Sequence, residues 1–217
     1  CVSYDPTFAY EVAVIVQDGL RRMYAEQEDV YYYITTLNEN YAHPAMPEGA
    51  EAGIRKGLYL LAAGAEAKKA PRVQLLGSGA ILREVLAAAD LLRDDWGVVA
   101  DVWSAPSFTE LARDAQDVES WNLLHPGEAA RTSWVGQCLA GRPGPVVAAT
   151  DYMRLYAEQI RAHVQAALRE PLTSVDLSSL DGAFKGGSVG LATYPDSADN
   201  AEDLIRMADQ DMYRRKE

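Results

Sequence analysis

Cysteine is nearly absent from this sequence, which contains only Cys1 and Cys138 among its 217 residues. The two lie far apart and fit neither a CxxC redox spacing nor a spacing of metal ligands. This excludes a disulfide framework and a cysteine-based metal site. We therefore expect a reduced, cytoplasmic protein in which one thiol is buried.

Long apolar runs and a surplus of basic residues are missing as well. No stretch approaches the roughly 18 apolar residues of a membrane-spanning helix, and the first residues do not resemble a signal peptide. With 20 Lys and Arg against 32 Asp and Glu, the net charge is −12. Nucleic acid and anionic membranes both bind basic surfaces, so we expect no nucleic-acid partner and no membrane partner.

Several catalytic signatures are also missing. The sequence has no GxxxxGK[ST] phosphate loop, no GxSxG nucleophile turn and no HExxH zinc motif. It does not begin with Met, so we expect Cys1 to be an interior position of a longer polypeptide or the start of a trimmed one.

What the sequence does contain is a regular alternation of strand and helix patterns. β-Branched, aromatic and apolar runs predict strands at 30–36, 57–61, 73–76, 97–103 and 145–150. Apolar periodicity and capping residues predict helices at 7–24, 50–56, 81–93, 107–124, 133–139 and 152–168. Ser107 or Thr109 is expected to cap the helix at 107–124, and Asp151 the helix at 152–168. This alternation predicts an α/β domain with a largely parallel sheet flanked by helices.

A glycine-rich turn, Gly77-Ser78-Gly79, joins a predicted strand to a predicted helix. Exposed N–H groups at a helix start can hold an anion. The turn is shorter than a dinucleotide fingerprint or a phosphate loop, and it lacks the third glycine or the lysine. A plain tight turn is therefore the favoured interpretation.

The three histidines, His43, His125 and His163, share no spacing. His43 lies in a polar loop, where a histidine can be catalytic. No partner for it is identifiable, so a surface or interface role is favoured.

Two further groups of polar and aromatic residues have simple explanations. The helix at 107–124 carries charged residues that we expect to form a solvated face rather than an acid–base pair; they are Glu110, Arg113, Asp114, Asp117 and Glu119. Neighbours on a strand point to opposite sides, so Tyr31 and Tyr33 should face one way and Tyr32 the other. Packing explains these tyrosines better than base stacking does.

Several stretches carry a resemblance to a known family. They are SYDPTFAYEVAVI (3–15), YYYITTLNENY (31–41), PAMPEGAE (44–51), QLLGSG (74–79), SFTELARD (107–114), WNLLHP (121–126) and TDYM (150–153). Through them, residues 1–164 resemble the C-terminal domain of the homodimeric bacterial pyruvate dehydrogenase, the decarboxylating first component of its complex. The resemblance implies the transketolase C-terminal fold.

The resemblance also limits what this chain can do alone. Similar enzymes use thiamine diphosphate and magnesium to decarboxylate pyruvate, and then acetylate a lipoyl group on the transacetylase component. Their cofactor lies between domains that would precede Cys1, and the sequence has no GDG motif with a downstream Asn. The resemblance therefore implies a structural, dimerising part with no catalytic or metal residue and no cofactor bound to this chain alone. The implied partners are the missing N-terminal dehydrogenase domains, a second subunit and the lipoyl-bearing transacetylase.

The end of the chain departs from that family. SVGLATYP (188–195) looks like the late strand, and NAEDLIRMADQDMYRRK (200–216) like the last helix, of a GGDEF domain, the diguanylate cyclase module that makes cyclic di-GMP from GTP. The cyclase signature is absent, because Gly187 is followed by Ser188 and Val189 rather than by an acidic pair and Phe. The resemblance leaves Lys216 as a candidate contact for a nucleotide phosphate, with a solvated helix end as the favoured alternative.

We therefore expect a transketolase C-terminal-like domain at 1–168, a linker at 169–187 and a GGDEF-like strand–helix remnant at 188–217. Two hypotheses stay open: a piece of a pyruvate dehydrogenase with a foreign tail, inactive alone, or a chimeric regulatory or interaction module with a degenerate cyclase-like tail. The strand at 188–194 would present unpaired edges by itself. We expect it to add to the edge of the first domain's sheet.

Overall fold

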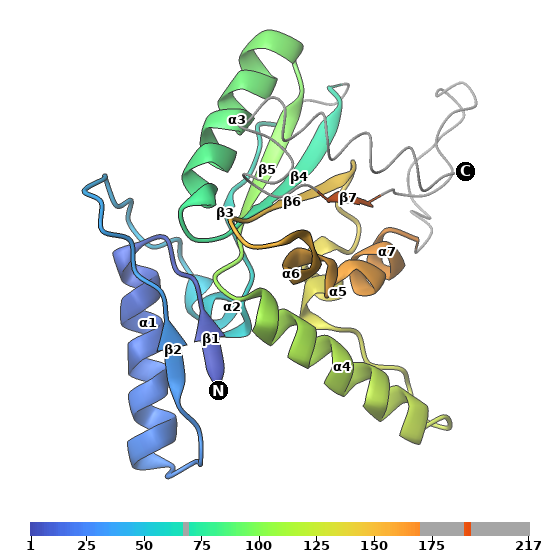
Figure 1. The fold of residues 1–217 in the computed structure, drawn as a ribbon. Coiled ribbons are helices and arrows are strands. Elements are labelled where there is room, and N and C mark those ends of the chain that lie inside the picture. The colour runs from blue at the N-terminus through green and yellow to red at the C-terminus, as the bar shows by residue number, and fades with distance from the viewer. Residues whose placement is uncertain (67–69, 170–188, 192–217) are drawn as a thin grey trace.

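The computed structural model describes residues 1–66, 70–169 and 189–191, and Figure 1 shows how they are arranged. A five-stranded sheet in the order β3-β5-β4-β6-β7 forms the centre. Its strands are β3 (Tyr59–Ala62), β4 (Arg72–Gly77), β5 (Val99–Ser104), β6 (Val146–Ala149) and β7 (Val189–Leu191). All neighbours pair in parallel except β3, which is antiparallel to β5. The predicted α/β class and largely parallel sheet are confirmed.

Helices cover both faces of this sheet (Figure 1). They are α2 (Ala50–Lys56), α3 (Ile81–Trp96), α4 (Phe108–Leu124), α5 (Trp134–Leu139), α6 (Arg154–Glu158) and α7 (Arg161–Arg169). Leu75 of β4 packs in a cluster with Leu82 of α3, whereas the next residue, Leu76, packs in another with Val135 of α5. Burial on both faces explains why β4 and β6 are apolar along most of their length.

A smaller layer precedes the sheet. Strands β1 (Val2–Tyr4) and β2 (Tyr32–Ile34) pair in parallel, beside helix α1 (Ala9–Leu20) and its π-helical extension η1 (Arg21–Ala25). Their buried cluster includes Tyr4 and Ile15, and it also contains Ile54 of α2 and Tyr59 of β3. The N-terminal layer is thus packed onto the main domain through a shared core.

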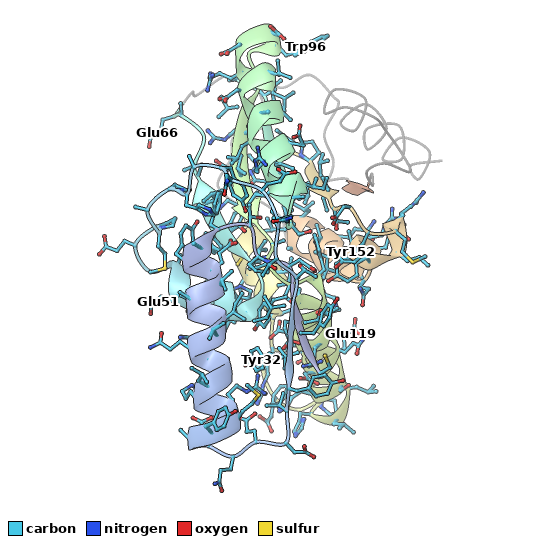
Figure 2. The ribbon with its side chains drawn as sticks, turned by 60° about the vertical axis from the view of Figure 1, so that its left-hand side comes forward. Tyr32, Glu51, Glu66, Trp96, Glu119 and Tyr152 are labelled. Atoms are coloured by element: carbon cyan, nitrogen blue, oxygen red, sulfur yellow. The ribbon has the colours of Figure 1, made fainter. Side chains whose placement is uncertain are left out.

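The alternation predicted for the three tyrosines is confirmed. Tyr31 and Tyr33 are 65% and 59% exposed. Tyr32 instead lies beside α1 (Figure 2), with its ring stacked on Tyr4 at 6.0 Å and its hydroxyl donating to Asp18 at 2.6 Å. Tyr32 is a packing residue, as strand geometry requires.

The caps are partly as predicted. Ser107, not Thr109, caps α4, because its hydroxyl oxygen accepts the Glu110 N–H at 3.0 Å. The prediction that Asp151 caps one helix at 152–168 is wrong. The Thr150 hydroxyl accepts the Tyr152 N–H at 3.3 Å and delays the helix start, so α6 begins at Arg154 after Met153. The segment is then divided, with α7 beginning at Arg161.

The predicted edge addition of the tail strand is confirmed for residues 189–191. Val189, Gly190 and Leu191 pair in parallel with Val146, Val147 and Ala148 of β6. Residues 170–188 and 192–217, which contain the rest of the predicted linker and remnant and Lys216, lie outside the described residues.

Candidate functional site

The candidate site lies where the parallel strands end. Gly77 of β4 is paired with Ser104 of β5 on one side and with Ala149 of β6 on the other, so three strand ends meet. Ligands of open α/β sheets bind outside the carboxyl ends of such strands. Here residues 3–11 of the chain lie against the strand ends, with hydrogen bonds to Gly79, Ser104 and Ser107. They bring two buried carboxylates, Asp5 and Glu11.

Glu11 is fully buried and all its hydrogen bonds come from neutral groups. Its Oε2 accepts the backbone N–H groups of Thr7 at 2.6 Å and Phe8 at 2.8 Å, which completes the first turn of α1. Its Oε1 accepts the hydroxyls of Tyr59 at 2.7 Å and Ser104 at 2.6 Å. Four donors on one carboxylate compensate its loss of hydration. Glu11 therefore joins α1 to β3 and to the end of β5.

Asp5 makes a second connection of the same kind. It is 3% exposed, and its Oδ1 accepts the hydroxyls of Thr35 and Tyr152, each at 2.8 Å. Its Oδ2 accepts the hydroxyl of Tyr156, also at 2.8 Å. Figure 2 shows Tyr152 on the segment that follows β6. Asp5 thus holds both β2 and the start of α6.

The tyrosines of this junction are held as neutral donors. Burial, followed by the charge of Glu11, raises the pKa of Tyr59. The hydroxyl of Tyr10 lies 2.7 Å from that of Tyr59, and burial raises its pKa to about 12. Burial and the charge of Asp5 raise the pKa of Tyr156 in the same way. The tyrosines therefore stay protonated donors, and their hydrogen bonds hold the segments of the junction together.

The Gly77-Ser78-Gly79 turn belongs to the junction. The N–H of Gly79 donates to the Asp5 carbonyl at 3.0 Å, and the Gly79 carbonyl accepts the Thr7 hydroxyl at 2.7 Å. The Ser78 hydroxyl is within 3.1 Å of the Thr150 hydroxyl. These groups bind the chain itself, which agrees with a tight turn.

A separate buried network lies in the middle of the sheet. Asp101 accepts hydrogen bonds from the Gln74 amide at 2.9 Å, the Gly64 N–H at 2.8 Å and Arg72 at 3.1 Å. Gln74 in turn accepts the Trp103 indole N–H at 2.9 Å. Burial opposes ionisation of Asp101, but these hydrogen bonds outweigh it and lower its pKa. This network aligns β4 with β5.

The structure does not bring the three histidines together. His43 Nδ1 accepts the N–H of Ala9 at 3.1 Å in the loop before α2. His125 stacks on Trp121 at the end of α4, with ring centroids 4.4 Å apart. His163 of α7 lies 3.1 Å from Glu119 of α4.

The charged residues of α4 are only partly a solvated face. Arg113 is exposed and pairs with Glu110 at 2.8 Å, but the Glu110 side chain is only 16% exposed, and burial raises the pKa of its carboxyl. Asp114 instead accepts the backbone N–H of Trp134, the first residue of α5, and Glu119 reaches His163. These two acids fasten neighbouring helices to α4.

Both cysteines are free; Cys1 is exposed and Cys138 is half-buried. Within the described ranges, no three His, Cys, Asp or Glu side chains are grouped to hold a metal ion. None of the helices in that part of the chain is both long and apolar enough to span a bilayer.

Sequence reasoning missed Asp5 and Glu11, although both lie in the stretch that carried the resemblance. Acidic residues of a first helical turn are usually exposed. A local sign exists only for Glu11, which occupies the third position after Phe8 and receives its N–H. The distant donors, Tyr59 and Ser104, have no sequence signal.

Comparison with known proteins places this junction at a domain boundary. Residues 1–44 match the family model described as the pyruvate dehydrogenase E1 component middle domain. Residues 57–170, more than half of the chain, match the transketolase-like C-terminal domain model. The chain belongs to the transketolase-like C-terminal domain family. In this family member, Asp5 and Glu11 lie in the first match, whereas Tyr59, Ser104 and Tyr156 lie in the second.

Curated relatives agree with both matches. The chain is 65% identical over 164 residues to the pyruvate dehydrogenase E1 component of Cupriavidus necator and 62% identical over 167 residues to that of Escherichia coli K12. A Buchnera aphidicola relative with the same description is 48% identical over 167 residues. Each comparison covers 76% of this chain but 18% of the relative's length.

Neither family match reaches beyond residue 170. The resemblance of the tail to a cyclase module gains no support from them. The remnant at 188–217, the role of Lys216 and the regulatory hypothesis therefore stay predictions.

Proposed function

We propose that this chain is a structural part of a pyruvate dehydrogenase first component, one that docks the end of the middle domain onto the transketolase-like C-terminal domain. The hydrogen bonds of Glu11 carry the proposal. Its carboxylate lies in the segment similar to the middle domain, and its hydroxyl donors, Tyr59 and Ser104, belong to the segment similar to the C-terminal domain. In this role the chain organises the enzyme and does not turn over substrate alone.

The activity belongs to the full-length protein in this proposal. That protein would decarboxylate pyruvate with thiamine diphosphate and magnesium, and pass the acetyl group to a lipoyl-bearing transacetylase. The turn at Gly79 does not fit the cofactor's diphosphate, because its N–H is bonded to Asp5. We therefore place the cofactor outside the described residues. N-terminal dehydrogenase domains and a second subunit complete the proposed assembly.

A chimera tests this role. The matched region of the Cupriavidus necator relative, 65% identical, is replaced by that of this chain, and pyruvate-dependent reduction of a dye acceptor is measured. We expect the chimera to be active and the isolated chain to show no turnover with thiamine diphosphate and magnesium. The same chimera with Glu11→Gln should lose activity together with thermal stability.

Each outcome bears on a different part of the proposal. Turnover by the isolated chain would contradict the non-catalytic role. A soluble, folded chimera without activity would contradict membership of the working enzyme. Full activity and stability in the Glu11→Gln chimera would leave the docking role of the junction without support.

A further inference from the structure

The N-terminus of α1 is capped from a distant loop. The first four N–H groups of a helix have no partner within the helix. Phe8, the residue before α1, offers no side-chain cap. The N–H of Ala9, the first residue of α1, instead donates to Nδ1 of His43 at 3.1 Å. His43 is 34 residues away, and it is exposed to solvent.

This bond fixes the chemical form of the imidazole. A ring nitrogen that accepts a hydrogen bond carries no proton, so a neutral His43 must hold its proton on Nε2. The ring is also held in place, with its centroid 4.6 Å from that of Tyr41 and 6.2 Å from that of Phe8. These ring contacts hold Nδ1 of His43 in position to accept the Ala9 N–H.

The charged surroundings of His43 come from three elements. Its own loop carries Glu39, which pairs with Arg83 of α3 at 2.7 Å. Arg83 also lies over the Tyr41 ring at 4.6 Å. On the α1 side are the N-terminal N–H groups, which carry partial positive charge, and the buried carboxylate of Glu11, which is already bonded to Thr7 and Phe8.

We propose that His43 is a pH-operated latch, which holds the tip of the loop between β2 and α2 against the N-terminus of α1 when neutral and releases it when protonated. A protonated ring has N–H groups at both nitrogens. It cannot accept the Ala9 N–H, and its charge faces the positive end of α1. The latch is therefore closed while the imidazole is neutral, and it opens when falling pH protonates the ring.

The release is local, because other contacts hold the loop on both sides of His43. The Tyr41 hydroxyl donates to the carbonyl of Thr7, and Ala50 donates its N–H to Pro47 at 3.2 Å. Glu11 keeps its four donors whatever the state of His43. Protonation thus frees the loop tip around residues 42–45 without opening the junction.

The first test is the tautomer of His43 in the whole chain. Long-range nitrogen–proton NMR spectra of the imidazole distinguish the Nε2–H form from the Nδ1–H form. We expect the Nε2–H form at about pH 8, above ordinary histidine titration. A dominant Nδ1–H form would overturn the proposal, because that ring could not accept the Ala9 N–H.

The second test follows amide hydrogen exchange at Ala9, corrected for the intrinsic pH dependence of exchange. Between about pH 8 and about pH 5.5, a span that brackets histidine titration, protection at Ala9 should fall roughly fivefold, as expected for one lost hydrogen bond. His43→Asn is the matched control, since its amide oxygen can take the place of Nδ1 without titrating. It should keep protection at both pH values.

His43→Ala completes the set, because it should show low protection at Ala9 at every pH. A pH-independent protection in the unmodified chain would overturn the latch, and so would the same fall in His43→Asn. These readouts do not depend on pyruvate turnover, so failure of the latch and failure of the proposed docking role are separate results.

Discussion

The hydroxyl of Ser104 donates to the carboxylate of Glu11 at 2.6 Å, although 93 residues separate them in the chain. Ser104 closes β5, in the segment similar to the C-terminal domain, and Glu11 lies in the first turn of α1, in the segment similar to the middle domain. The contact is buried and uses no basic residue. Through this contact, the end of the sheet binds the N-terminal segment that contains α1.

Replacing Glu11 with Gln should strongly destabilise the chain. The Gln amide has one oxygen and one NH2 group, and its NH2 would meet donors that now point at a carboxylate oxygen. Buried donors without acceptors lower the free energy of unfolding by about 2–4 kcal/mol. Urea denaturation of the unmodified chain and of Glu11→Gln measures the difference in free energy of unfolding.

Glu51→Gln is the matched control for that substitution. Glu51 also lies in the first turn of a helix, α2, but it is exposed. Its free energy of unfolding should change by no more than about 0.5 kcal/mol. Equal effects at the two positions would contradict the special role of Glu11.

The two tyrosines that bind Asp5 should differ in importance. Tyr156→Phe removes the donor to Oδ2, and we expect a loss of about 2 kcal/mol because a buried charged acceptor is left without it. Tyr152→Phe leaves the Thr35 hydrogen bond to Oδ1 in place. Because Tyr152 is 37% exposed, water can replace its lost hydroxyl donor. Its effect should be about 1 kcal/mol or less.

A double-mutant cycle with Asp5→Asn separates these bonds from other effects of the substitutions. The coupling energy measured by urea denaturation should be larger for the Asp5–Tyr156 pair than for the Asp5–Tyr152 pair. The reverse order would show that the exposure of Tyr152 does not weaken its contact.

The strands and helices of the main domain could be predicted because the residue patterns that specify them are local in the sequence. Apolar runs and helical periodicity predicted β4, α3, β5 and α4 to within a few residues, and Ser107, one of the two candidate caps, marks the start of α4. The break between α6 and α7 was not predictable. The late start of α6 was not predicted either, because Tyr152 and Tyr156 are held by Thr150 and the distant Asp5.

The candidate site could not be predicted for the same reason. Each of its carboxylates is defined by partners far along the chain, such as Ser104 for Glu11 and Tyr156 for Asp5. Sequence spacing reports neighbours on one helix or strand, and it carries no information on which strand end a helix will meet. The resemblance identified the right segments but assigned them no residue roles.

Gly77→Ala should destabilise the chain by crowding rather than by removing a ligand site. A Cβ at Gly77 would lie 2.9 Å from the Leu82 Cα and 3.0 Å from the Val85 Cγ2. Overpacking of this kind lowers the free energy of unfolding by about 2–3 kcal/mol. Gly127→Ala, where a Cβ meets nothing within 4 Å, should change it by about 0.5 kcal/mol or less. Equal stability of the two variants in urea would show that α3 can move away from β4.

Cys138 should resist alkylation in the folded chain. Burial raises the pKa of its thiol to about 11, so the reactive thiolate is scarce at about pH 8. The exposed Cys1 serves as the internal reference. Treatment with iodoacetamide followed by peptide mass spectrometry should label Cys1 first, and Cys138 should reach a similar rate only in denaturant. Because the thiolate fraction of Cys138 grows as the pH approaches its pKa of about 11, the difference should shrink as pH rises. Equal labelling of both cysteines at about pH 8 in the folded chain would contradict the shielding of Cys138 by the core residues around it.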